Sequence, residues 1–361
     1  MPTFYVDETG FTGEDLLATD QPMFVNATND FSDEEARGIV EDIFKGVQLK
    51  ELKYRQLSRR PNHQERVVQL IKLFAADPKR VGTWVAHKEF GLVTLIEWWL
   101  EPLAHRSGLN LYKDGANLAT ANMLFICLEG FWSNSFRRNL LTHFQRMFRS
   151  RTEERFDDCR KFIEKAKKKA NERQADTLRY LWPSFELLGL DHVTHCPDKV
   201  LDLALPGLVF LGHKWRERHE GPWEVVHDQS SNMAKQKWLW DALSSPDIAQ
   251  AQFPGPDGPS TFPMNISTTR FGNSESELQL QLCDVLAGAT SEWLSAVAVG
   301  NDNDPYHTKL RDAGIESLVV GNIWPSKDIT PEELGRRGWD GNRAIEFLTK
   351  ELQTGEKQHL N

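Results

Sequence analysis

Hydrophobic positions toward the two ends of the chain come in short runs rich in β-branched and aromatic residues. Runs of roughly four to eight such residues predict β-strands. The run TFYV ends at the sequence Asp-Glu-Thr-Gly, and the run WEVVH ends at an aspartate. The expected strands are 3–6, 23–26, 80–87, 223–227 and a segment within 262–271.

Elsewhere apolar residues recur every three or four positions, which is the spacing of one face of an α-helix. Ser32 and Glu35 have the spacing of a capping box and predict the start of a helix that ends near Gly46. Ser274 and Glu277 predict a second helix start in the same way. Helices are expected over 32–46, 65–75, most of 90–188, 233–243 and 275–294, with a Pro- and Gly-rich loop over 253–263. Thr330 and Pro331 predict a further helix start, and a final helix is expected after Gly338 and Gly341 to about residue 352.

This order of elements predicts an α/β protein. Strands on both sides of a long helical middle indicate one sheet whose sequence is interrupted by a helical insertion. Parallel strands need a crossover segment between them, and the intervening helices supply it. We therefore expect a mixed sheet flanked by helices, with a helical insertion.

Composition narrows the class of protein further. The 361 residues are 40% hydrophobic and 26% charged, as in ordinary globular chains. The most apolar segment, 203–211, is too short to span a bilayer and contains Pro206, and the first ten residues lack the features of a secretion signal. The four cysteines are far apart and form neither a zinc motif nor a disulfide framework. These features predict a soluble cytoplasmic protein with reduced thiols and no membrane partner.

One segment of this acidic chain is basic. The formal net charge is −9, yet residues 137–173 contain 13 Lys or Arg and 6 Asp or Glu. A local basic surface suits a nucleic-acid backbone. A solvated helix face explains the same pattern, because acidic residues interleave it from Glu153 onward. The candidate phosphate-binding residues are Arg137, Arg138, Arg146, Arg149 and Arg151.

Two aspartates follow directly after predicted strands. Asp7 comes after TFYV, and Asp228 comes after WEVVH. The carboxyl ends of strands in an open α/β sheet line the crevice where ligands bind, so neighbouring strands would bring these two side chains together. The alternative for each is a helix cap or a turn residue.

A third acidic position lies on the helix expected over 275–294. At about 100° per residue, Gln281, Asp284 and Gly288 cluster beside the apolar stripe of this helix. Gly288 would let a backbone or a ligand approach closely. A lone mid-helix aspartate is otherwise usually solvated.

Facing carboxylates require a proton or a cation, because two of them about 4 Å apart repel by roughly 4 kcal/mol at an effective dielectric of 20. Oxygen ligands suit Mg²⁺ or Mn²⁺, and two such ions can stabilise both oxygens of a phosphodiester displacement. Glu51 and Lys53 could add a fourth carboxylate and a phosphate-facing cation, although surface charge is the simpler interpretation of both. A solvated position is also the simpler interpretation of Lys88.

Four motifs occur in a fixed order along the chain: VDETG at 6–10, KELKY at 50–54, VVHDQSS at 225–231 and NSESELQLQLCDVLAGA at 273–289. Together they resemble a bacterial family known as domain of unknown function thirty-eight hundred. That family has an Asp-Glu pair near its N-terminus and a Gln-x-x-Asp motif near its C-terminus. Here the pairs are Asp7-Glu8 and Gln281-x-x-Asp284, and Cys283 stands where the family usually has a small alanine.

The resemblance implies a ribonuclease H-like fold with an acidic, metal-binding site. By this analogy Asp7 is the central metal ligand, and Glu8, Asp228 and Asp284 are further ligands. Glu51 becomes a fourth catalytic carboxylate. Gln281 would orient a ligand or a water through a hydrogen bond.

The resemblance also suggests a division of the chain. Residues 1–105 and 220–300 would form the two parts of the ribonuclease H-like core. Residues 106–219 would be a mainly helical insertion, and residues 301–361 a helical extension.

We therefore expect a nuclease dependent on Mg²⁺ or Mn²⁺ that cuts RNA or DNA, with bacterial defence against mobile elements as a hypothesis for its biological role. The alternative is a non-catalytic ribonuclease H-like module that binds nucleic acid or a protein partner, including a second copy of the chain. A phosphatase or nucleotide hydrolase that uses the same metals is a third interpretation.

Overall fold

Six strands form one mixed sheet in the order β7-β4-β1-β2-β3-β8. The computed structural model describes residues 1–195, 201–219, 221–229, 238, 240–245, 248–253 and 260–341. Only β2 runs antiparallel to its neighbours, so the other five strands point in one direction. The strands are β1 (Thr3–Thr9), β2 (Met23–Asn29), β3 (Val81–His87), β4 (Trp223–Asp228), β7 (Ile266–Gly272) and β8 (Val319–Ile323), and a separate two-stranded sheet pairs β5 (Ala251–Phe253) with β6 (Ser260–Phe262).

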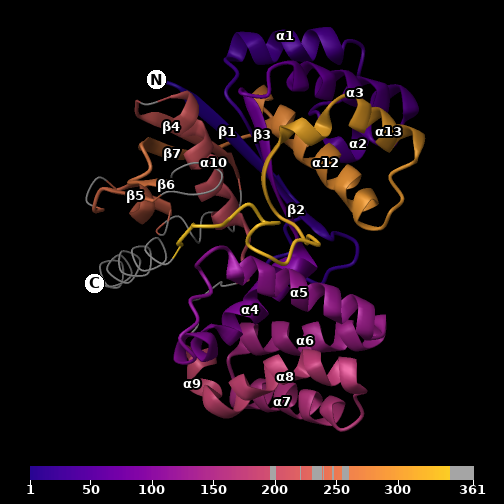
Figure 1. The fold of residues 1–361 in the computed structure, drawn as a ribbon. Helices are drawn as coiled ribbons and strands as arrows, with labels where there is room; N and C mark the ends of the chain where they lie inside the picture. Colours follow the sequence, from indigo (N-terminus) through magenta and orange to yellow (C-terminus); the bar gives the residue numbers. More distant parts are fainter. Residues whose placement is uncertain are drawn as a thin grey trace.

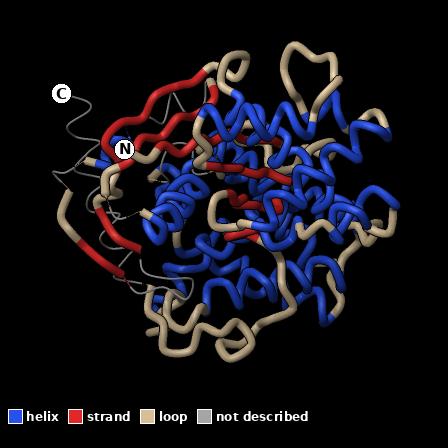
Figure 2. The backbone as a smooth tube through the Cα atoms, turned by 90° about the horizontal axis from the view of Figure 1, so that it is seen from above, coloured by secondary structure: helices blue, strands red, loops and turns tan. Residues whose placement is uncertain are grey.

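Helices cover both faces of the sheet, and Figure 2 shows the strands between them. Alternation of side chains along β1 explains the two layers, because Phe4 and Val6 pack toward α10 and Tyr5 packs toward α12. One face carries α10 (Ala204–Arg218). The other face carries α1 (Asp33–Ile43), α2 (Tyr54–Leu57), α3 (Pro61–Ala76), α12 (Leu278–Ala298), α13 (Pro305–Asp312) and the short helix η1 (Ile315–Leu318).

A separate helical layer lies below the sheet in Figure 1 and has its own core. Trp99, Phe144 and Phe148 are fully buried in it. Leu16 and Leu17, from the connection between β1 and β2, are buried in the same cluster. The layer consists of α4 (Lys88–Arg106), α5 (Ala116–Phe131), α6 (Asn134–Ser150), α7 (Glu153–Lys167), α8 (Glu172–Leu187) and α9 (Gly189–Thr194).

The boundary between core and insertion differs from the expected one. Helix α10 lies within the expected insertion 106–219, yet Leu208, Leu211 and Trp215 pack against the sheet. Helix α4 lies mainly within the expected core segment 1–105, yet its apolar side chains belong to the helical layer. The apolar faces of these two helices, rather than their position in the chain, decide which layer each joins.

Residues 301–341, the described part of the expected helical extension 301–361, are not mainly helical. Residues 319–323 form β8, which pairs with β3 at the edge of the main sheet. Thr330 and Glu333 exchange the hydrogen bonds of a helix cap, but the chain then makes only turns through Gly335 and Gly338, both at positive φ. Two left-handed positions so close together stop a helix from propagating.

Of the two predicted capping boxes, the one at Ser32 and Glu35 is confirmed. The second is wrong, because α12 begins after Glu277 without a side-chain cap. The carboxylate of Glu277 instead binds Arg270 (2.9 Å). Cys127, Cys159 and Cys283 are free thiols. Cys196, most of the expected helix 233–243, residues 254–259 of the expected loop and residues 342–352 of the expected final helix lie outside the described residues.

Candidate acidic site

Asp7 lies on the sheet face that α12 covers. Tyr5 packs into the cluster beneath α12, and alternation along β1 places Asp7 on the same side. Only 6% of Asp7 is exposed, and its carboxylate accepts the backbone N–H of Glu8 (2.8 Å). Burial raises the pKa of Asp7 well above its ordinary value, and the negative charges of Asp284, Glu8 and Asp228 raise it further. An ionised Asp7 therefore requires a nearby positive charge.

Asp228 is the last residue of β4 and adjoins Asp7 across the parallel ladder. The register pairs Tyr5 with Val226 and Val6 with His227, so the next residues along the two strands are Asp7 and Asp228. Val226 belongs to the cluster under α12, which places Asp228 on that face as well. Asp228 ends β4, but Asp7 lies within β1, which continues to Thr9 rather than ending at Val6 as expected. The register still brings the two aspartates together, as the sequence predicted.

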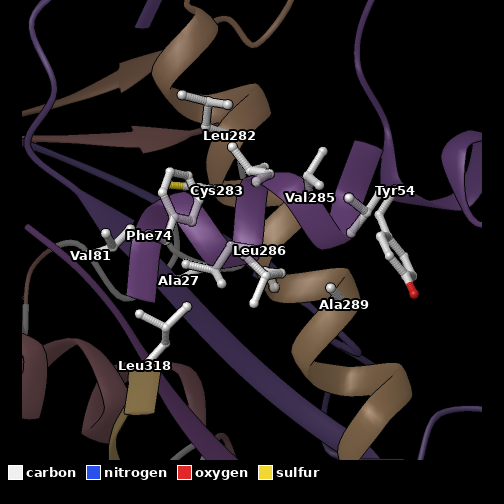
Figure 3. Packing of buried hydrophobic residues seen from close by; sticks show 14 of the residues in the cluster. Ala27, Tyr54, Phe74, Val81, Leu282, Cys283, Val285, Leu286, Ala289 and Leu318 are labelled. Carbon is white, nitrogen blue, oxygen red and sulfur yellow. The ribbon is translucent and has the colours of Figure 1, made fainter. Parts of the chain in front are cut away.

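Helix α12 brings the third aspartate to this group. It packs across β1 and β2, and Figure 3 shows its side chains Leu282, Val285 and Leu286 in the cluster that holds Phe74 and Val81. Asp284 lies beside this buried stripe. Its negative charge raises the pKa of Asp7 more than the charge of Glu8 or the charge of Asp228 does. Burial raises the pKa of Asp284 itself, against the opposing effects of the Tyr54 N–H and Lys53.

Gln281 and Asp284 bind the backbone of the segment that leads into α2. Gln281 accepts the N–H of Leu52 (2.8 Å), and Asp284 accepts the N–H of Tyr54 (2.7 Å). Gln281 also donates to the carbonyl of Ser274 (2.7 Å). These bonds fix the KELKY segment on α12, so Gln281 positions a chain segment of the site.

That segment delivers Glu51 and Lys53 to the acidic group. Lys53 Nζ lies 2.9 Å from Glu51 Oε1 and 3.6 Å from Asp284 Oδ2. Its side chain is 30% exposed, so the interpretation of both residues as ordinary surface charges is wrong. Burial would lower the pKa of Lys53, but Glu51, Asp284 and Asp7 together raise it. Burial would raise the pKa of Glu51, but hydrogen bonds from Ser274 and Lys53 lower it.

Ser274 is a member of the site that the sequence did not identify. Its hydroxyl accepts a hydrogen bond from Lys53 Nζ (3.4 Å) and interacts with Glu51. The sequence pattern assigned it to a helix cap. Because the partner segment lies more than 200 residues away in the chain, local spacing contained no signal for this role.

Glu8 differs from the other carboxylates in its partner. Its Oε2 lies 3.3 Å from Nε2 of His227, and alternation places it on the face opposite Asp7, away from the expected metal position. Its charge still raises the pKa of Asp7. Glu8 thus adds to the negative electrostatic potential at Asp7 from the other side of β1.

Some of the candidate phosphate-binding arginines contact other parts of the protein, and some of them are exposed. Arg137 forms ion pairs with Glu89 (3.0 Å) and Glu129 (2.9 Å), and Arg138 donates to the carbonyl of Leu17 (2.7 Å). The structure therefore uses these two to join α6 to its neighbours. Arg151 takes a left-handed backbone conformation at the end of α6 and donates to the carbonyl of Phe148. The two arginines on α6 that are exposed and have no ion pair within the described residues are Arg146 and Arg149.

Lys88 is not solvated, contrary to expectation. It begins α4 directly after β3, is 1% exposed, and donates to the hydroxyl of Thr12 (3.0 Å). Burial lowers the pKa of Lys88 to about 8, although Asp20 and Asp15 partly oppose the shift. The covering connection between β1 and β2 is distant in the sequence, so its effect on Lys88 could not be read from neighbouring residues.

The donor chemistry of the site fits a hard divalent cation. Asp7 and Asp228 offer carboxylate oxygens, and among the described residues Asp7 has no ion pair. The full set does not converge, however: no group of three His, Cys, Asp or Glu side chains in the described ranges is arranged to hold a metal ion. Lys53 stands between Glu51 and Asp284 instead.

Comparisons with protein-family models, curated proteins and solved structures give no match for this chain. Within the part of the chain that the structure describes, no helix has both the length and the apolar character needed to cross a membrane.

Proposed function

We propose that this chain is a metal-dependent nuclease whose site is built on Asp7 and Asp228. The observation that carries the proposal is the burial of Asp7 near Asp228 and Asp284, with no ion pair to Asp7 among the described residues and Lys53 acting on it only from farther away. Such a group is costly unless a cation or a proton compensates it. Divalent cations held by carboxylates at strand ends are well suited to phosphodiester chemistry.

The strand order supports this proposal. Strands β3-β2-β1-β4-β7, with β2 alone reversed, are compatible with a ribonuclease H-like arrangement, and β8 extends it at one edge. The motifs that resemble domain of unknown function thirty-eight hundred supply Asp7, Glu51, Lys53, Asp228, Gln281 and Asp284, all of which lie in or around the site. Membership in that family is part of the proposal.

Each residue would have a distinct task. Asp7 and Asp228 would hold Mg²⁺ or Mn²⁺, which when bound would activate water and stabilise the leaving oxygen. Asp284 and Gln281 fix the segment that carries Glu51 and Lys53. Arg146 and Arg149 are the exposed arginines available to contact a nucleic-acid backbone.

A cleavage assay tests the function directly. End-labelled single-stranded RNA, single-stranded DNA, their duplexes and the hybrid should be incubated with the protein in Mg²⁺, Mn²⁺ or EDTA. We expect metal-dependent cleavage of at least one substrate, and its loss in Asp7→Asn and Asp228→Asn. Asp312→Asn, an exposed aspartate on α13, is the matched control and should cleave normally. Cleavage that survives Asp7→Asn, or that EDTA leaves unchanged, would refute the proposal.

The second candidate is a module that binds nucleic acid without cutting it. The ion pairs of Lys53 with Glu51 and Asp284 favour this alternative, because they neutralise part of the cluster without any metal. A binding module would shift labelled nucleic acid in EDTA as well as in Mn²⁺. Its affinity would also be the same after Asp7→Asn.

A further inference from the structure

Lys53 is held by its neighbours more firmly than a surface lysine. The backbone N–H groups on either side of it, from Leu52 and Tyr54, are bound by Gln281 and Asp284 of α12. Leu52 and Tyr54 are both less than 10% exposed. The main chain at Lys53 is therefore anchored at two points, and its side chain starts from a fixed position.

The ammonium group at the end of this side chain has three oxygen partners. Glu51 Oε1 lies at 2.9 Å, Ser274 Oγ at 3.4 Å and Asp284 Oδ2 at 3.6 Å. The hydroxyl of Ser274 accepts a hydrogen bond from this ammonium, and the two carboxylates form ion pairs with it. Both oxygens of Asp284 have a partner, because Oδ2 faces Lys53 and Oδ1 accepts the Tyr54 N–H.

Asp7 has no comparable partner. It is more than nine-tenths buried, it accepts only the adjacent Glu8 N–H, and no ion pair reaches it within the described residues. The positive charge in the site is thus placed asymmetrically, toward Glu51 and Asp284. Lys53 acts on Asp7 only from beyond ion-pair distance, so the carboxylate on β1, beside Asp228, is compensated less than Glu51 and Asp284.

We propose that Lys53 permanently fills one of the two cation positions of the site, so that the protein binds a single divalent ion at Asp7 and Asp228. This inference rests on the proposed function and specifies its metal requirement. Lys53 is then a positioning residue that holds Glu51 and Asp284 in place of a second metal ion. A second dication could bind at Glu51 and Asp284 only after the ammonium had left.

Metal binding without any substrate tests this directly. Mn²⁺ should be titrated calorimetrically into the full chain, wild type and Lys53→Met, and the loaded proteins examined by electron paramagnetic resonance. We expect one ion per wild-type chain with the spectrum of an isolated Mn²⁺. Lys53→Met should bind two ions and give the spectrum of an exchange-coupled pair, whereas Lys53→Arg should bind one.

Lys50→Met is the matched control. Lys50 is three residues away in the same segment, 79% exposed, and paired with Glu275 outside the carboxylate group. It removes the same charge and should leave a single ion bound. Circular dichroism in EDTA checks the fold of each variant, and Lys53→Gln replaces Lys53→Met if the latter does not fold.

The outcomes separate the two proposals. One bound ion in both wild type and Lys53→Met, with affinities within twofold, overturns the role of Lys53 but leaves the metal site intact. Two ions in the wild type overturn it as well. If neither protein binds Mn²⁺, the proposed function fails and this inference fails with it.

Discussion

Asp284 Oδ1 accepts the backbone N–H of Tyr54 at 2.7 Å, although 230 residues separate the two in the chain. Gln281, one turn earlier on α12, accepts the N–H of Leu52 in the same manner. Residues three apart on a helix share a face, and residues two apart in an extended segment present their N–H groups on the same side. The Gln-x-x-Asp motif therefore anchors the main chain of the segment that carries Lys53.

Gly288→Ala should disturb the packing of α12 against Tyr54 and lower the stability of the protein. A Cβ at Gly288 would lie 2.3 Å from the ring of Tyr54, which has no room to move because it is buried. We expect a loss of about 1–3 kcal/mol in the free energy of unfolding, the usual cost of overpacking. Urea denaturation followed by circular dichroism measures it. Gly130→Ala on α5 is the control, since nothing lies within 4 Å of its added methyl, and it should gain about 0.5–1 kcal/mol. Equal stability of the two variants would contradict the packing argument.

Asp7→Asn should stabilise the metal-free protein at neutral pH. Because the pKa of Asp7 is raised in the folded state, the folded state binds its proton more tightly than the unfolded state does. The wild type must therefore lose stability as pH rises from about 4 toward the raised pKa. Melting temperatures in EDTA should favour Asp7→Asn at pH 7 and become similar near pH 4. Added Mn²⁺ should stabilise the wild type and not the variant. A variant less stable than the wild type at pH 7 would show that ionised Asp7 is already compensated.

Lys88→Met should remove a stability change on the alkaline side. The pKa of Lys88 is lowered to about 8, so between pH 8 and 10.5 the unfolded state binds more protons and wild-type stability rises with pH. At about 1.4 kcal/mol per pKa unit, the buried charge costs up to about 3 kcal/mol below pH 8. We expect Lys88→Met to exceed the wild type by about 1–3 kcal/mol at pH 7, with the gap closing toward pH 10. Denaturation at both pH values gives the comparison, and a constant gap would assign the effect to packing alone.

The double variant Arg146→Ala/Arg149→Ala should weaken nucleic-acid binding and its salt dependence. Each lost phosphate contact lowers the slope of log affinity against log salt by about 1. Fluorescence anisotropy across a salt series measures both quantities. Arg137→Ala should leave the slope unchanged and instead cost stability, because Arg137 is paired with Glu89 and Glu129. If Arg137→Ala changed the slope and the double variant did not, the binding surface would lie elsewhere.

Part of the acidic site could be predicted, because each strand aspartate follows an apolar run that is visible in the sequence and the two strands are parallel. Asp7 and Asp228 each follow an apolar run, and the parallel register of β1 and β4 places them side by side, although β1 continues two residues beyond Asp7. Asp284 was predictable from the helical period, which set it beside the buried stripe with Gly288. The α/β class followed from the same periodicities.

The rest depended on contacts between distant segments. Whether Lys53 and Lys88 are solvated is decided by Asp284 and by Thr12, which no local pattern connects to them. Strand β8 was missed because its sequence, VVGNI, is too short to be distinguished from a loop by pattern alone. Its strand conformation depends on pairing with the edge of β3. The division of the arginines on α6 likewise depended on Glu89, Glu129 and Leu17.

The loop between β1 and β2 has a consequence for attempts to shorten this chain. Leu16 and Leu17 are buried among the helices of the lower layer, and Gln145 of α6 binds both the Leu16 N–H and the Asp15 carboxylate. A truncated version without residues 106–219 would leave two leucines in water and strip α10 from the sheet. The helical layer is therefore not a transplantable accessory. A minimal form of this protein would require a redesigned loop and a new cover for the sheet.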